Sequence, residues 1–318
     1  MDTGPGDRHP LITLIKYLLE IMRRPHGPTY RAWAYLSRDM GDSTGIIGKE
    51  SISMAWEHKV PEGQTDVMPG TTPTSWYTPP DNAQHIAYVG KDNKIHECSF
   101  KFAPEGHDWE HTVPSDGHPV TEIGTNSTSW YTPPDNAQHI AYIGNDQQIH
   151  ECFKFAPESH HWEHTWPSPG HPKARLITSP TSWYTPPDRA QHIAYIEDGL
   201  GVINELFFNF APGEYHWEHT LPLDGHAKAV TWTSPTSWYT PSDNVQHIAY
   251  VGGDSQIHEI FFRFTPGGFH WEPSLPSPGH PKVEPGTRPT SWYTKPDNTQ
   301  HIAYVGQDNK IHELFYQL

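Results

Sequence analysis

The chain repeats a unit of about 54 residues, and this period limits what it can fold into. The segment QHIAYVGKDNKIHE, residues 84–97, recurs in near-copies along the chain. Its HIAY histidines lie at positions 85, 139, 192, 247 and 301, and the tryptophans of a second marker, SWYT, follow the same steps. A third marker, Trp followed by Glu, falls at positions 56, 109, 162, 217 and 271. A fixed period of this size is typical of repeat architectures, in which every unit adopts the same local structure.

Each unit reads as four short strands. In the copy at 74–113 they are TSWYT, QHIAYVG, KIHECSFKF and HDWEHTV, with the turn segments PPDNA and GKDNK after the first and second strands. The 33 prolines and 25 glycines of the chain oppose long helices and favour such turns. Four antiparallel strands per unit is how a β-propeller blade is built. We therefore predict an all-β chain that forms a β-propeller of four-stranded antiparallel blades.

The number of blades depends on the first 70 residues. We expect one propeller domain over 1–318, with blades at 71–116, 125–169, 178–224, 233–278 and 287–318, the last of which stops after its third strand. A step of 53 back from Trp109 reaches Trp56, so residues 20–65 indicate a degenerate sixth blade, and residues 1–19 would supply the strand that closes the ring. The alternative is five blades, with Trp56 and its neighbours completing the last blade and a helix at 11–22 in a separate appendage.

Charge and composition narrow the class of partner. The chain has 21 Lys and Arg against 37 Asp and Glu, a formal charge of −16, which argues against binding to nucleic acid. No signal peptide is evident, and the apolar run at 11–22 is too short to span a bilayer. We expect no membrane insertion and a cytoplasmic or non-classically secreted protein. Cys98 and Cys152 occupy equivalent repeat positions, and we expect both to be free, buried thiols.

The recurrent hairpin places a histidine and a glutamate at its two ends. In an antiparallel hairpin these residues lie close across the ladder. The pairs are His85–Glu97, His139–Glu151, His192–Glu205, His247–Glu259 and His301–Glu313. Five copies of one site weigh against catalysis and favour weak, repeated binding of a multivalent target. A carboxylate and an imidazole beside an aromatic wall suit a sugar, and the candidate walls are Trp109, Trp162, Trp217 and Trp271.

These residues resemble a known family, the fungal fucose-specific lectins of the Aleuria aurantia type. The resemblance rests on the IHE triplets at 95–97, 149–151, 257–259 and 311–313, the 12-residue spacing and the following tryptophan. It implies a six-bladed, multivalent carbohydrate-binding lectin, with no enzymatic activity and no cofactor, whose sites lie between adjacent blades. The glutamates would accept sugar hydroxyls and the tryptophans would stack on the sugar. Glycans or glycoproteins are the implied partners, with fucose or a related sugar as ligand, and a homodimer is left open.

One departure from that family concerns the sugar. Where the family has arginine this chain has histidine, which is shorter and has fewer hydrogen-bond donors. The identity of the sugar therefore stays open.

A structural role for the His–Glu pairs is the main alternative. In WD-repeat propellers a His, an Asp and a Trp form a buried network that holds the blade together, and Trp76, His85 and Asp92 recur here in the same way. The chain would then be a non-enzymatic protein-interaction propeller. We expect no metal site in clusters such as HDWEH, because Trp109 lies between His107 and His111 on one strand face. No nucleophile elbow or phosphate loop indicates an enzyme.

Overall fold

The computed structural model describes residues 60–61, 63–102, 109–157, 161–210, 216–222, 227–264 and 270–318. The chain divides into two units, Met1–Glu57 and His58–Leu318, and all of the described residues belong to the second. Every regular element in this described part is a strand, which confirms the all-β prediction. The same residues include no helix long and apolar enough to cross a membrane.

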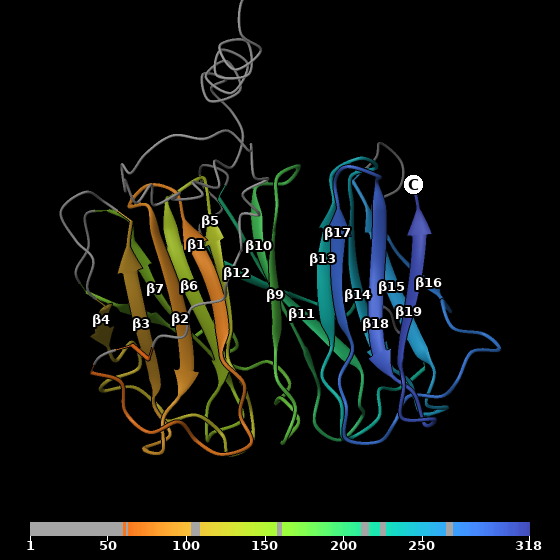
Figure 1. Ribbon diagram of the computed structural model, residues 1–318, viewed down its shortest axis with the longest axis horizontal. Helices are drawn as coiled ribbons and strands as arrows, with labels where there is room; N and C mark the ends of the chain where they lie inside the picture. Colours follow the sequence, from red (N-terminus) through yellow and green to blue (C-terminus); the bar gives the residue numbers. More distant parts are fainter. Residues whose placement is uncertain are drawn as a thin grey trace, which may run out of the picture. The chain divides into compact units, whose positions relative to one another are not determined.

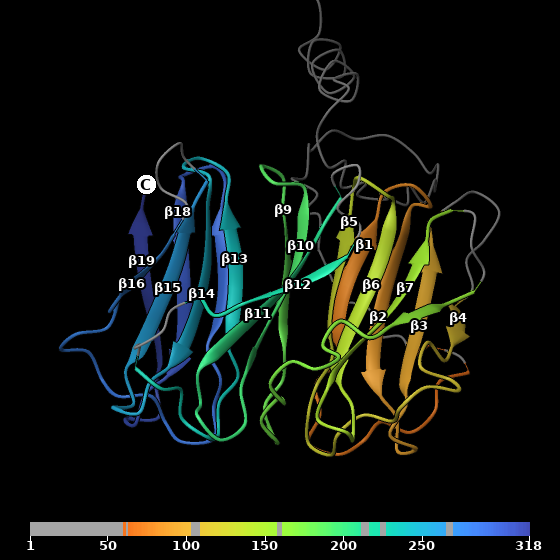
Figure 2. The ribbon, with the colours of Figure 1, turned by 180° about the vertical axis from the view of Figure 1, so that it is seen from behind.

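Five antiparallel sheets follow one another in chain order, and we number them as blades 1 to 5 (Figures 1 and 2). Blade 1 contains β1 (Thr74–Thr78), β2 (Ala83–Val89), β3 (Ile95–Lys101) and β4 (Trp109–Thr112). Blade 2 contains β5 (Thr128–Thr132), β6 (Ala137–Ile143), β7 (Ile149–Phe155) and β8 (Glu163–Thr165). Blade 3 contains β9 (Thr181–Thr185), β10 (Ala190–Ile196), β11 (Ile203–Asn209) and β12 (Trp217–Thr220). Blade 4 contains β13 (Thr236–Thr240), β14 (Val245–Val251), β15 (Ile257–Arg263) and β16 (Trp271–Ser274), and blade 5 contains β17 (Thr290–Thr294), β18 (Thr299–Val305) and β19 (Ile311–Gln317).

The predicted β-propeller blades are therefore present. In blade 1 the predicted second and third strands each agree with the observed strand to within one residue at either end. The predicted closing strand at 1–19, the degenerate blade at 20–65 and the alternative helix at 11–22 lie outside the described residues, apart from 60–61 and 63–65. The described part shows five blades, and a sixth stays a prediction.

The turn of the middle hairpin requires a glycine because a histidine ring packs over it. Asp92 Oδ1 accepts a hydrogen bond from His96 Nε2 at 2.9 Å and another from the backbone N–H two residues after the aspartate. A Cβ atom on Gly90 would lie 2.5 Å from His96 Nε2. Blades 2, 4 and 5 repeat this arrangement, whereas blade 3 has Glu197 in place of the glycine and Asn204 in place of the histidine. The Gly-x-Asp and His positions are thus one structural unit and change together.

Neighbouring blades are joined by a seam of side-chain hydrogen bonds between the first strand of one blade and the first two strands of the next. At the seam between blades 1 and 2, Thr74 Oγ1 lies 2.7 Å from Ser129 Oγ, and Trp76 Nε1 donates to Gln138 Oε1 at 3.2 Å. The next three seams repeat both contacts, through Thr128–Ser182 and Trp130–Gln191, Thr181–Ser237 and Trp183–Gln246, and Thr236–Ser291 and Trp238–Gln300. The recurrent Thr-Ser-Trp and Gln-His segments therefore specify contact between blades.

The hydrophobic core also lies between blades. One cluster joins Trp130 and Ile149 of blade 2 to Tyr195 and Leu206 of blade 3. The SWYT tryptophans of blades 2, 3 and 4 are at most 6% exposed and pack in clusters that join neighbouring blades. Trp292, in the last blade, is 38% exposed. Cys98 and Cys152 are free and buried, as predicted.

Ile177 adopts a backbone conformation that suits glycine. Its φ is 65°, and the equivalent positions in blades 1, 2 and 5 are Gly70, Gly124 and Gly286, with φ between 78° and 84°. A β-branched residue in the left-handed region is strained by about 1–2 kcal/mol. The Ile177 side chain is 63% exposed, so little burial offsets this strain.

We expect Ile177→Gly to raise the free energy of unfolding by roughly 0.5–1 kcal/mol, because the relieved strain exceeds the backbone entropy that glycine loses on folding. Urea unfolding at pH 7 measures this change. Ile123→Gly is the matched control, since Ile123 is 67% exposed and has an ordinary φ. A loss of stability in Ile177→Gly equal to that in the control would contradict the strain.

Candidate binding site

The predicted histidine and glutamate of each blade are hydrogen-bonded to each other. The Nδ1 to Oε1 distances are 2.7, 2.8, 2.9, 2.8 and 2.7 Å in blades 1 to 5. The ladder pairs Glu97 with Ala87, so His85 reaches the carboxylate diagonally from two residues along β2. The predicted proximity of the two side chains is therefore seen in all five copies.

The histidine is held from two further directions. The rings of Trp76 and His85 are stacked, with centroids 4.9 Å apart and planes 11° from parallel. His85 Nε2 lies 2.7 Å from Thr78 Oγ1, and this hydroxyl donates to Asp81. Asp92, which the structural alternative placed beside His85, contacts His96 instead. The buried network around His85 therefore contains Trp76, as expected, but has Thr78 and Asp81 in place of Asp92.

At the seam between blades 1 and 2 the glutamate is surrounded by donors from the protein itself. Glu97 Oε2 accepts from Thr112 Oγ1 at 2.6 Å and from Trp162 Nε1 of the next blade at 3.3 Å. Lys154 Nζ lies 3.6 Å from the same oxygen and 4.8 Å from the centroid of the Trp162 ring. Glu97 has no exposed surface. A ligand at this seam would have to displace protein contacts.

The glutamates become more accessible toward the end of the chain. Glu151, Glu205 and Glu259 are 1%, 3% and 7% exposed, and the Glu313 side chain is 48% exposed. A hydroxyl of the fourth strand donates to each of the first three, from Thr165, Thr220 and Ser274. Trp217 and Trp271 pack against the cores between blades 2 and 3 and between blades 3 and 4. In the described part Trp109 Nε1 is buried without a hydrogen-bond partner.

A cavity of about 490 Å³ lies at the seam between blades 4 and 5. The carboxylate of Glu259, the hydroxyl of Ser274 and the amide of Gln300 line it, together with the ring of Tyr316. Tyr316 is 63% exposed and stands opposite a glutamine in the ladder, where blade 2 has Lys154. A concave site with a few convergent polar groups beside aromatic surface is typical of ligand pockets. This seam therefore places the predicted Glu259 in the lining of a cavity.

Sequence reasoning missed several residues of this cavity. Gln300 could have been found from the Gln-His pair that recurs in every repeat. Tyr316 could have been found from a position that is aromatic in four of the five repeats, through Phe100, Phe208, Phe262 and Tyr316. Arg263 occupies a position that varies between repeats, so the period gave no signal for it.

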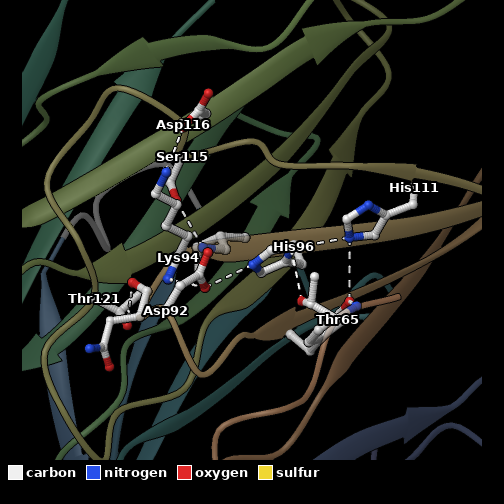
Figure 3. A network of polar contacts seen from close by, with 11 residues as sticks. Thr65, Asp92, Lys94, His96, His111, Ser115, Asp116 and Thr121 are labelled. Carbon is white, nitrogen blue, oxygen red and sulfur yellow. Dashed lines mark hydrogen bonds and ion pairs between the residues drawn. The ribbon is translucent and has the colours of Figure 1, made fainter. Parts of the chain in front are cut away.

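A second polar cluster lies on the opposite face of the same strands (Figure 3). His96 Nδ1 is 3.1 Å from His111 Nε2, and Asp92 holds the other nitrogen of His96. Blade 2 repeats the arrangement with His150, His164 and Asp146. Across the described ranges no group of three or more His, Cys, Asp or Glu side chains is placed to hold a metal ion.

The fold is shared with known lectins. No family model matches the chain, and no curated protein matches its sequence. Among solved structures, AofleA from Arthrobotrys oligospora is 14% identical, with a TM-score of 0.57 over 79% of this chain and 70% of that one. The BP39L lectin from Burkholderia pseudomallei is 11% identical, with a TM-score of 0.58 over 80% and 67%. Aleuria aurantia lectin, described as a six-bladed β-propeller, is 13% identical, with a TM-score of 0.51 over 77% and 74%. At these identities the similarity establishes the propeller fold.

The charge of Glu97 stabilises the fold at neutral pH. Burial by itself would raise the pKa of Glu97, but the hydrogen bond from His85 and the charge of Lys154 outweigh it and lower the pKa to about 2. Because the pKa of Glu97 in the folded state lies below the ordinary glutamate value of 4.5, this stability is fully present above pH 4.5 and is lost as the pH falls toward 2.

We expect Glu97→Gln to flatten the pH dependence of the unfolding free energy between pH 4.5 and 2, removing a change of about 3 kcal/mol. Urea unfolding at a series of pH values measures this slope. Glu110→Gln, at an exposed position on β4, is the control and should keep the wild-type slope. Parallel curves for wild type and Glu97→Gln would show that the charge has no such role.

Proposed function

We propose that this protein is a non-enzymatic, carbohydrate-binding lectin that binds a sugar in the cavity between blades 4 and 5. The supporting observation is the meeting of Glu259, Ser274 and Gln300 with the exposed ring of Tyr316 in one cavity. A carboxylate and an amide can bind sugar hydroxyls, and an aromatic ring can cover the apolar C–H face of the sugar. The fold of the lectins named above gives independent support.

The sugar that we propose is fucose or a close relative. SapL1, which shares the fold with a TM-score of 0.52 at 18% identity, is a lectin whose structure was solved with alpha methyl fucoside. Arg263 lines the cavity. His247, which also lines it, occupies the position at which the Aleuria aurantia type of lectin has its sugar-binding arginine. We therefore propose that Arg263 and Glu259 provide the charged contacts to the ligand.

We propose that the equivalent seams between blades 1 and 4 add weaker sites, which makes the protein multivalent. Each of these seams has the glutamate, and the next blade supplies Trp162, Trp217 or Trp271. Repeated weak sites on one molecule strengthen binding to glycans or glycoproteins that present several copies of the sugar.

A protein-interaction propeller with structural His–Glu pairs is the second candidate. The observation that favours it is the burial of Glu97, Glu151 and Glu205, all at most 3% exposed and all bonded within the protein. In that case the pairs stabilise each blade, and a free sugar does not change the stability of the folded protein.

A glycan array followed by calorimetric titration with the best sugar distinguishes the two candidates. We expect Glu259→Gln to weaken sugar binding roughly tenfold to a hundredfold, because a hydrogen bond to a charged group contributes about 1.5–3 kcal/mol. Tyr316→Ala should weaken it as well. Glu97→Gln is the matched control: it makes the same change at a fully buried copy and should lower stability while leaving the strongest site intact.

Two results would contradict the proposal. One is an array on which no glycan binds. The other is a sugar whose affinity is the same in wild type, Glu259→Gln and Tyr316→Ala, which would place the site elsewhere on the chain.

A further inference from the structure

We propose that the cross-strand histidine pairs of blades 1 and 2 are binding sites for a divalent transition-metal ion of the Cu²⁺, Ni²⁺ or Zn²⁺ class. The pairs are His96 with His111 and His150 with His164 (Figure 3 shows the first). They are separate from the His–Glu pairs of the proposed sugar site and do not depend on that function. The proposal does not rest on the HDWEH cluster within one strand, since each pair joins two neighbouring strands.

The distances within each pair fit coordination of one ion. The facing nitrogens, Nδ1 of one ring and Nε2 of the other, are 3.1 Å apart in both blades. Nitrogens at about 2.0–2.1 Å from a tetrahedral ion lie roughly 3.3 Å from each other. A shift of a few tenths of an ångström, with the hydrogen on Nε2 of His111 or His164 moving to Nδ1 of the same ring, therefore converts the hydrogen-bonded pair into a pair of ligands. Imidazole nitrogen suits Cu, Ni and Zn.

A carboxylate fixes the ring that would bind the ion. Asp92 Oδ1 lies 2.9 Å from His96 Nε2, and Asp146 Oδ1 lies 3.0 Å from His150 Nε2. Because the carboxylate accepts the hydrogen on Nε2, Nδ1 keeps its lone pair and faces the partner histidine. A carboxylate behind a histidine ligand is the usual arrangement of protein metal sites, where it orients the ring and raises its basicity.

The partner histidines are reachable from solvent. His96 and His150 are buried, whereas His111 and His164 are partly exposed, so an ion can approach from solvent. In blade 1, Thr65 Oγ1 and Tyr88 OH lie 3.3 and 3.4 Å from the two facing nitrogens and add oxygen donors beside them.

Blades 3 and 4 are natural controls because each has only half of the pair. In blade 3 His219 Nε2 lies 2.6 Å from Asn204 Oδ1, and asparagine replaces the first histidine. In blade 4 His258 Nε2 lies 3.0 Å from Asp254 Oδ1, but Pro273 occupies the place of the second histidine. The same ladder position is His111 in blade 1 and His164 in blade 2.

Titration of the full chain with Cu²⁺ alone, by calorimetry and electron paramagnetic resonance, tests the proposal. We expect His111→Ala and His164→Ala each to remove one bound Cu²⁺ and its imidazole nitrogen couplings. His219→Ala is the control and should remove none. Pro273→His should add one Cu²⁺ with two imidazole nitrogens, because Gly252, Asp254 and His258 of blade 4 already match the first half of the site. Asp92→Asn should weaken the blade 1 site by about 10–100-fold.

Two outcomes would overturn the proposal. One is unchanged Cu²⁺ stoichiometry in the double variant His111→Ala and His164→Ala, which would place any bound copper at other histidines. The other is a folded Pro273→His variant that binds no additional copper. Thermal unfolding without metal shows that each variant is folded, so a loss of binding is separable from a loss of structure.

Discussion

The hydrogen bond from a tryptophan of one blade to a glutamine of the next is the contact on which the arrangement of blades depends. It occurs at all four seams of the described part, between 3.0 and 3.2 Å, always beside a Thr–Ser contact of 2.7 Å. The same tryptophan ring stacks on the histidine that holds the glutamate. One side chain therefore links packing between blades to the geometry of the candidate site within a blade.

The two faces of a blade carry different polar side chains. Glu97 and His85 face the next blade, where Trp162 and Lys154 meet them. His96, one residue along β3, faces the other way and belongs to the histidine pair. In blades 1 and 2 the third strand thus contributes to two polar clusters, one equivalent to the proposed sugar site and the other proposed to bind a metal ion. The two proposals concern different faces and can succeed or fail separately.

Much of the fold could be predicted from the sequence because the period fixes where strands begin and end. The turn residues and the alternation along QHIAYVG place the hairpins, and the proximity of His85 and Glu97 follows from antiparallel pairing. The partner of the glutamate could not be predicted, since Trp162 approaches from the next blade and sequence spacing does not report contacts between blades. The histidine pairs were missed for a related reason. His96 and His111 are 15 residues apart on neighbouring strands, and their diagonal contact depends on the register.

The sequence also could not predict which copy of the site is accessible to a ligand. Every repeat has the same glutamate, yet Glu97 is fully covered while Glu259 lines a cavity. Trp162, beside the fourth strand of blade 2, covers Glu97, whereas the described part of blade 5 has three strands. A crystal structure of the chain with bound alpha methyl fucoside tests this account most directly. The account predicts sugar density between Glu259 and Tyr316. An empty cavity there, with the sugar bound at a surface away from the blade seams, would contradict it.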